Sequence, residues 1–201
     1  MNLFKKIFGP NSDSNSDENT EKSPYNPSES IPTDELFTNK FINNGGKFIY
    51  CENPVELNEN FVNILVENDW FENKVICDNQ ILLQIVKENN LEISKDLDSK
   101  FIFTTCENLI ADEGSILFSS KQIQQKKPND LPVNFIVYAT TSQIAKNKSD
   151  GMRSLKNKYV TEYPTNITSI TNFNTESKGE QDFLNYGNSP KNMYLLLLED
   201  L

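Results

Sequence analysis

The stretch Phe103–Ser120, FTTCENLIADEGSILFSS, decides the fold, because apolar runs flank the densest polar cluster of the chain. We expect one strand over Phe101–Thr104 (FIFT) and another over Ser115–Phe118 (SILF), since short apolar runs between polar residues are typical of buried strands. Cys106–Ala111 lies between them and is predicted to form a short helix. A strand, a helix and a strand in this order indicate an α/β domain.

The polar side chains of this stretch form the first candidate site. Thr104 or Thr105 could cap the predicted helix, and Glu107 would then lie in its first turn, where the helix dipole favours a carboxylate. Asp112 and Gly114 follow where the helix ends and the next strand begins. Ligands of α/β proteins collect at the carboxyl ends of strands, so a carboxylate here could be a nucleophile, a base or a ligand anchor. The alternative is a structural role, with a capping threonine, an acidic turn and a glycine of positive φ.

From Asp34 onward the chain alternates between apolar runs and helical periods, which predicts an α/β domain with a largely parallel sheet. Further strands are expected at Lys47–Cys51, Lys74–Cys77, Val133–Tyr138, Asn166–Ile170 and Met193–Leu198. Helices are expected at Val55–Trp70, Gln80–Glu88 and Thr141–Tyr159, the last broken near Asp150-Gly151.

The N-terminal part of the chain has a different composition. Gly9–Thr33 is rich in Ser, Asn, Asp, Glu and Pro and has almost no large apolar residue, which predicts a disordered acidic linker. In the preceding MNLFKKIFG, the apolar residues would share one side of a short helix flanked by Lys5 and Lys6. Residues 1–8 could therefore make weak contact with a membrane surface or dock on a partner. We expect a tail over residues 1–33 and one domain over residues 34–201.

Composition excludes several classes of function. The chain of 201 residues has 29 acidic and 19 basic side chains, a net charge of −10, so no binding to nucleic acid is expected. It contains no histidine, and Cys51, Cys77 and Cys106 are far apart. Histidine catalysis, histidine-bound metal and an iron–sulfur cluster are therefore excluded within this chain, and we expect neither a metal nor a cofactor. Few cysteines, no signal peptide and no long apolar run indicate a cytoplasmic protein.

Arg153, the only arginine of the chain, marks a second candidate site. In Ser149–Arg153 (SDGMR), a capped helix start with a guanidinium in its first turn could grip a carboxylate or a phosphate. The alternative is an ordinary surface arginine. The segment Ser119-Ser120-Lys121, at the end of a predicted strand, could add hydrogen-bond donors to a site.

The segment Phe103–Ser120 resembles the central segment of the LUD domain, a family of lactate-utilisation proteins that includes LutC-like proteins. That family typically shows a threonine, a short acidic helix ending in Ile-Ala-Glu-Thr-Gly-Thr, and an apolar strand; here Ile110–Ser115 (IADEGS) stands at this ending. The resemblance covers roughly Asp34 to Leu201 and continues through Pro164–Thr168 (PTNIT) to the terminal strand MYLLLLED. With its MNLFKK start, the chain is similar to the short, N-terminally tailed members from Bacteroidetes-type bacteria.

The resemblance implies a three-layer α/β/α fold, similar to the superfamily of sugar-phosphate isomerases (NagB and RpiA) and CoA transferases. It further implies an accessory protein for the oxidation of L-lactate to pyruvate, with protein partners that carry the iron–sulfur clusters. We expect such a protein to bind a small anionic metabolite, for example a 2-hydroxy or 2-oxo acid. In this hypothesis the ligand-binding candidates are Thr104, Thr105, Glu107, Asp112, Gly114 and, as the anion anchor, Arg153.

Two departures from the family pattern leave the chemistry open. Transferases of this fold use a glutamate two residues before a glycine, and Asp112, which is one methylene shorter, stands there instead. The segment Thr171–Gly179 (TNFNTESKG) replaces a Gly-Pro-Ser-type loop. The alternative hypothesis is therefore a non-enzymatic interaction module with a degenerate pocket, tethered through its N-terminal segment. The sequence does not decide whether the chain is an enzyme.

Overall fold

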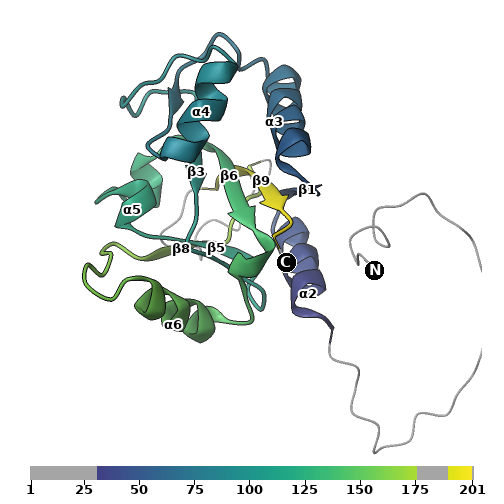
Figure 1. Ribbon diagram of the computed structural model, residues 1–201, viewed down its shortest axis with the longest axis vertical. Helices are drawn as coiled ribbons and strands as arrows, with labels where there is room; N and C mark the ends of the chain where they lie inside the picture. The colour runs from purple at the N-terminus through teal and green to yellow at the C-terminus, as the bar shows by residue number, and fades with distance from the viewer. Residues whose placement is uncertain (1–30, 176–189, 201) are drawn as a thin grey trace, which may run out of the picture. The chain divides into compact units, whose positions relative to one another are not determined.

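The structure is a computed structural model, and it describes residues 31–175 and 190–200 (Figure 1). By its contacts the chain divides after Ile31, and all the helices and strands of the described residues lie in the unit from Pro32 to Leu201. The predicted linker before Ile31, the N-terminal segment 1–8 and the end of the loop Thr171–Gly179 lie outside the described residues. No helix within the described residues is long and apolar enough to cross a membrane.

A five-stranded sheet forms the centre of the domain, and every pair of neighbouring strands in it is parallel. Its carboxyl ends therefore meet at one edge, where ligands of such sheets usually bind. In spatial order the strands are β1 (Lys47–Cys51), β9 (Asn192–Leu198), β6 (Asn134–Thr140), β3 (Phe101–Thr105) and β2 (Val75–Ile76).

Two helices, α3 (Pro54–Asn68) and α4 (Gln80–Glu88), lie on the same side of this sheet (Figure 1). Each begins at an asparagine, Asn53 or Asn79, whose side-chain oxygen accepts hydrogen bonds from two backbone N–H groups of the first turn. The buried faces of both helices pack on apolar residues of β3, β6 and β9, and in this core Phe61 of α3 stacks on Phe103 with ring centroids 4.4 Å apart.

A second sheet of four strands was not predicted. Its strands, in spatial order, are β7 (Ile144–Ala145), β4 (Asn108–Ile110), β5 (Ser115–Phe118) and β8 (Thr168–Ile170). The prediction of a helix over Cys106–Ala111 was therefore wrong. All residues of β4 are buried, and its backbone pairs with β5 on one side and β7 on the other. So short a helix would leave most of its backbone groups without partners, whereas the sheet supplies them.

The predicted helix over Thr141–Tyr159 is also shorter in the structure. Its first part forms a 3-10 turn, η2 (Thr141–Gln143), and then β7, and only α6 (Lys148–Lys158) is helical. No break occurs at Gly151, which lies inside α6 and is buried. A Cβ atom there would lie 2.7 Å from the Ile110 side chain, so the absence of a side chain lets α6 approach β4 closely.

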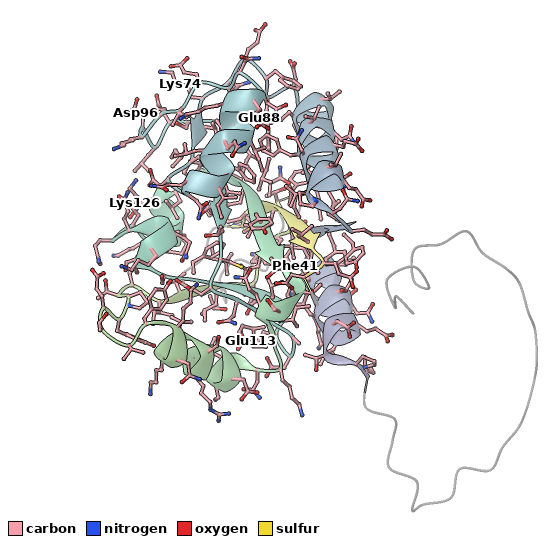
Figure 2. The ribbon with its side chains drawn as sticks, in the orientation of Figure 1. Phe41, Lys74, Glu88, Asp96, Glu113 and Lys126 are labelled. Atoms are coloured by element: carbon pink, nitrogen blue, oxygen red, sulfur yellow. The ribbon has the colours of Figure 1, made fainter. Side chains whose placement is uncertain are left out.

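The helix α2 (Thr33–Asn43), which the sequence patterns did not predict, packs on β1, β5 and β7. Its Phe41 side chain is fully buried and contacts Phe173 with ring centroids 4.9 Å apart (Figure 2). The short elements α5 (Ser120–Ile123) and η1 (Pro128–Asp130) complete the domain. The other predicted elements are present within two residues of their expected bounds, so the predicted α/β class with a mostly parallel sheet flanked by helices is confirmed.

Candidate functional site

A polar hollow with a cavity volume of about 390 Å³ lies beyond the carboxyl ends of β2 and β3. Three segments supply its wall: the end of β3, the residues that lead from β2 into α4, and the helix α5. We call this region the strand-end hollow. Its lining residues are Asp78, Asn79, Gln80, Ile81, Thr104, Thr105, Lys121 and Gln122.

Local hydrogen bonds place two of these wall segments. Asn79 caps α4 by accepting from the N–H groups of Ile81 and Leu82, at 3.0 and 3.3 Å. Ser119 caps α5, because its hydroxyl accepts from the Lys121 N–H at 3.2 Å and its own N–H donates to the Gln122 side chain at 2.8 Å. Asn79 lies three residues after β2 and Ser119 directly follows β5, so each capping residue begins a helix close to the end of a strand.

The strand-end hollow offers both hydrogen-bond donors and an acceptor. The Lys121 ammonium lies 3.1 Å from the Glu162 carboxylate in an exposed pair, which contributes little and is easily exchanged for a ligand. Asp78 accepts one hydrogen bond, of 3.3 Å, from the Gln124 amide. Within residues 31–175 and 190–200 the Thr105 hydroxyl makes no hydrogen bond. A ligand with an anionic group and a hydroxyl group would find partners here.

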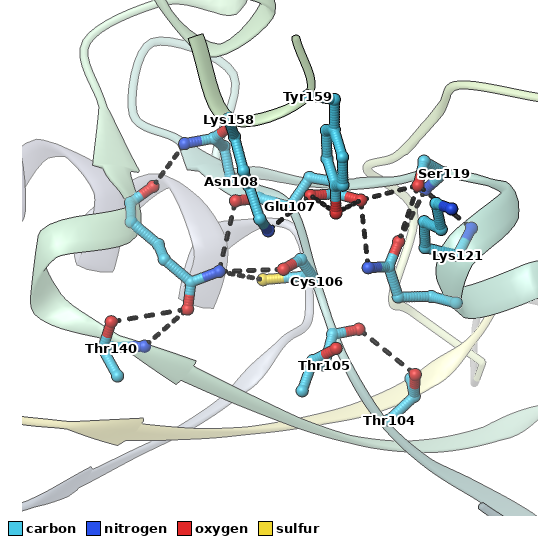
Figure 3. Close-up of polar contacts among 12 residues, drawn as sticks. Thr104, Thr105, Cys106, Glu107, Asn108, Ser119, Lys121, Thr140, Lys158 and Tyr159 are labelled. Carbon is cyan, nitrogen blue, oxygen red and sulfur yellow. Dashed lines mark hydrogen bonds and ion pairs between the residues drawn. The ribbon is translucent and has the colours of Figure 1, made fainter. Parts of the chain in front are cut away.

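Glu107 lies outside this hollow, in a closed network of hydrogen bonds (Figure 3). Its side chain is 0% exposed and accepts from four donors. These are the Ser119 hydroxyl at 2.6 Å, the Gln122 amide at 3.1 Å, the Lys158 ammonium at 2.9 Å and the Tyr159 hydroxyl at 3.1 Å. The prediction that Glu107 lies in the first turn of a helix was wrong, since it immediately precedes β4.

The charge states within this network follow from its contacts. Burial alone would raise the pKa of Glu107, but hydrogen bonds from Ser119, Lys158 and Gln122 outweigh it and hold the pKa below its usual range. Burial likewise lowers the pKa of Lys158, and the Glu107 carboxylate more than reverses this, so that the lysine pKa is raised. The pair is therefore ionised at neutral pH, and the carboxylate has no free lone pair with which to act as a base or nucleophile. Gln122 belongs to both regions, so Glu107 positions an amide of the hollow.

The three cysteines are free and buried. Burial raises the pKa of Cys51 and of Cys77 to about 11, and it also raises the pKa of Cys106, which is fully enclosed beside Glu107. All three are thiols at neutral pH, and a thiol is a poor nucleophile.

Asp112 and Gly114 lie in the turn that joins β4 to β5, and neither lines the strand-end hollow. Gly114 has φ +62°, and a Cβ atom there would lie 2.5 Å from the carbonyl carbon of Lys40 in α2. The Asn44 amide at the end of α2 donates to the carbonyl groups of Glu113 and Gly114, at 2.9 and 3.2 Å. This turn therefore serves to dock the hairpin on α2.

Arg153 is separated from the other candidates. It lies in the middle of α6, not in the first turn, and its side chain is 73% exposed and 3.3 Å from Asp150. It lines a different hollow, of about 450 Å³, along the surface of α6, and this hollow shares no residue with the strand-end hollow. The structure thus brings only Thr104 and Thr105 of the six candidates to the strand-end hollow. The sequence patterns missed Asp78, Asn79, Gln80 and Gln122 there, although the first three directly follow a predicted strand.

A match to a protein-family model shows to which family the chain belongs. A model of the LUD domain matches residues 67–198, which is more than half of the chain. The chain belongs to the LUD-domain family. The predicted family is therefore confirmed, and the strand-end hollow lies within the matched residues of this LUD domain.

A solved structure has a similar fold. The fold is similar to that in a crystal structure, at 1.70 Å resolution, of a DUF162 family protein from Deinococcus radiodurans. The TM-score is 0.58 with 12% sequence identity, over 85% of this chain and all of the other. At this identity the similarity establishes the fold alone. No curated protein matches the sequence.

Proposed function

We propose that this LUD-domain protein binds a small 2-hydroxy acid such as L-lactate in the strand-end hollow. The observation that carries the proposal is the arrangement of one carboxylate and several hydrogen-bond donors around a single cavity at the carboxyl ends of β2 and β3. The Thr105 hydroxyl and the Lys121 ammonium suit a carboxylate, whereas the Asp78 carboxylate suits the hydroxyl group of the same molecule. A 2-oxo acid has no such hydroxyl to donate and would meet Asp78 with repulsion.

The proposed role is that of an accessory protein linked to oxidation of L-lactate to pyruvate. The LUD-domain family is associated with lactate utilisation, and this chain has no cluster-binding cysteine pattern. Protein partners would then supply the redox centres. Binding of the 2-hydroxy acid by this chain would be its contribution to such an assembly.

Calorimetric titration of the full chain with L-lactate and with pyruvate tests the proposal. L-lactate should bind more tightly than pyruvate. Lys121→Met and Thr105→Val should each weaken lactate binding by about 5- to 20-fold, because a hydrogen bond to a charged group is worth about 1.5–3 kcal/mol and these sites are partly solvated. Asp78→Asn should narrow the preference for lactate over pyruvate.

Arg153→Ala is the control, since Arg153 lies in the separate hollow on α6. It should leave both affinities unchanged. Lactate affinity that survives Lys121→Met and Thr105→Val but falls with Arg153→Ala would move the site to α6. If neither acid binds, the proposed ligand site is wrong, and the alternative of a non-enzymatic interaction module is favoured.

A further inference from the structure

An apolar groove with a cavity volume of about 430 Å³ lies between α3 and α4. Its lining comes from both helices and from the carboxyl-terminal parts of β6 and β9. The apolar residues that matter here are Val55 and Leu57 of α3, Ile81 and Ile85 of α4, and Tyr138 and Leu198 of the strands. A cavity of this size and character is typical of a small-molecule site.

Two of these side chains are unusually open to solvent. Val55 is 68% and Ile81 is 71% exposed, although both lie beside other apolar residues of the groove. An apolar ligand chain would cover them, and the gain would grow with the area removed from water.

The groove and the strand-end hollow are neighbours, because Ile81 in the first turn of α4 lines both. The two parts differ in chemistry. The hollow carries the Lys121 ammonium and the threonine hydroxyls beside the Asp78 carboxylate. Among the described residues that line the groove, the charged one is Glu88 (Figure 2). The Glu88 carboxylate would therefore repel an acid group from the groove, and Lys121 would hold that group in the hollow. An apolar chain would be more stable in the groove than among the polar groups of the hollow.

From this juxtaposition we infer that the ligand is larger than lactate: a 2-hydroxy acid whose unbranched apolar chain passes over Ile81 into the groove between α3 and α4. The inference rests on the proposed function for the position of the head group. It adds the substrate class, because the groove selects for chain length and the hollow for the 2-hydroxy acid group.

The test is a titration series in which only the chain grows: L-lactate, 2-hydroxybutanoate, 2-hydroxyhexanoate and 2-hydroxyoctanoate, with the full-length protein. Each methylene group that enters the groove should tighten binding by about 2- to 4-fold, the upper value being that of complete burial. Val55→Gln should reduce the advantage of 2-hydroxyoctanoate over lactate by about 5-fold or more and leave lactate affinity unchanged.

Val66→Gln is the matched control. Val66 lies on the same helix as Val55 and is similarly exposed, at 65%, but it does not line the groove. It should change no affinity in the series. 1-Octanol, which has a comparable chain without the acid group, should bind more weakly than 2-hydroxyoctanoate by at least about 10-fold, since it cannot use Lys121.

The outcomes separate this inference from the proposed function. Lactate binding that depends on Lys121 and Thr105 but does not tighten with chain length overturns the inference and leaves the proposed function standing. If 1-octanol binds as tightly as 2-hydroxyoctanoate, and Lys121→Met changes neither affinity, the proposed head-group site is wrong, and the inference fails with it. An equal effect of Val55→Gln and Val66→Gln on the long acid overturns the groove as the place of the chain.

Discussion

Thr105 and Glu107 are two residues apart in the sequence, yet the structure places them in opposite situations. Thr105 lines the strand-end hollow, and among the described residues its hydroxyl makes no hydrogen bond. Glu107 is fully buried and accepts from four donors. Of these two polar residues, the neutral and less conspicuous one is available to a ligand, and the charged one is committed to the fold.

This difference shows that the charge of a side chain does not indicate whether its hydrogen-bonding capacity is still available to a ligand. A buried carboxylate is costly unless it is paired, and the pairing consumes the lone pairs that chemistry would need. A hydroxyl at the edge of a hollow keeps its capacity, because water satisfies it until a ligand arrives.

The largest effect is expected for Glu107→Ala, which removes the acceptor shared by Ser119, Lys158 and Tyr159. We expect a loss of about 3 kcal/mol in the free energy of unfolding, measured by urea denaturation, because the buried Ser119 hydroxyl and the half-buried Gln122 and Tyr159 groups lose their acceptor. Glu162→Ala is the control: Glu162 also accepts from a lysine, but its side chain is 85% exposed, and the loss should stay below about 0.5 kcal/mol. Equal losses for both variants would contradict a structural role of Glu107.

Gly114→Ala tests whether the turn between β4 and β5 stabilises the fold or contributes to ligand binding in the strand-end hollow. We expect a loss of about 2–3 kcal/mol, because the left-handed backbone disfavours alanine and the new Cβ would meet the backbone of α2. Lactate affinity should not change. In Gly151→Ala the new Cβ meets only the end of the Ile110 side chain, and the gain in helix propensity offsets part of the clash, so stability should change by less than about 1 kcal/mol.

Lys191 extends the comparison to a buried charge that has no carboxylate in contact among its described partners. Its side chain is fully buried, and its ammonium donates to the carbonyl groups of Leu131 and Pro132, at 2.9 and 3.2 Å. Burial lowers its pKa to about 8, and the charge of Asp130 opposes this only in part. The unfolded chain then binds more protons than the folded one between about pH 8 and pH 10.5, so stability rises with pH across this window.

The corresponding measurement compares the wild-type protein with Lys191→Met in urea at two pH values. Relative to the variant, the wild type should gain about 2 kcal/mol between about pH 7 and about pH 9.5, since one pKa unit corresponds to about 1.4 kcal/mol. A difference between the two proteins that is constant with pH would show that Lys191 titrates normally.

The smallest effect on stability is expected for Thr105→Val, which keeps the shape and removes the hydroxyl. Stability should change by less than about 0.5 kcal/mol, because this hydroxyl makes no hydrogen bond to the part of the chain that the structure describes. Lactate affinity should fall in the same variant. A stability loss comparable to that of Glu107→Ala would mean that Thr105 is also part of the closed network, and the comparison would fail.

Much of the fold followed from local patterns. The strands Lys47–Cys51 and Ser115–Phe118 and the helix Gln80–Glu88 have the bounds that periodicity predicted, because each has a uniform apolar pattern with turn or capping residues at its ends. β4 was missed because it has only three residues, and its pairing partners β5 and β7 define it more than its own sequence does.

The candidate site was predicted only in part. Thr104 and Thr105 were found because they end a clear apolar strand, and the end of a strand in a parallel sheet is an exposed edge. Asp112 and Arg153 were grouped with them because polar clusters look alike in sequence. The structure separates them: Asp112 lies at the far end of a hairpin and Arg153 on the surface of α6.

The sequence by itself determined the class of the protein: apolar runs alternating with helical periods specify a parallel sheet flanked by helices, and the absence of histidine removes whole families of chemistry. Only the tertiary structure decided which polar side chains already have hydrogen-bond partners within the protein. Lys158 and Tyr159 lie about fifty residues beyond Glu107 in the chain, and they reach its carboxylate only because α6 packs on β4. Hydrogen-bond satisfaction is a property of three-dimensional neighbours, and local sequence patterns carry no record of it.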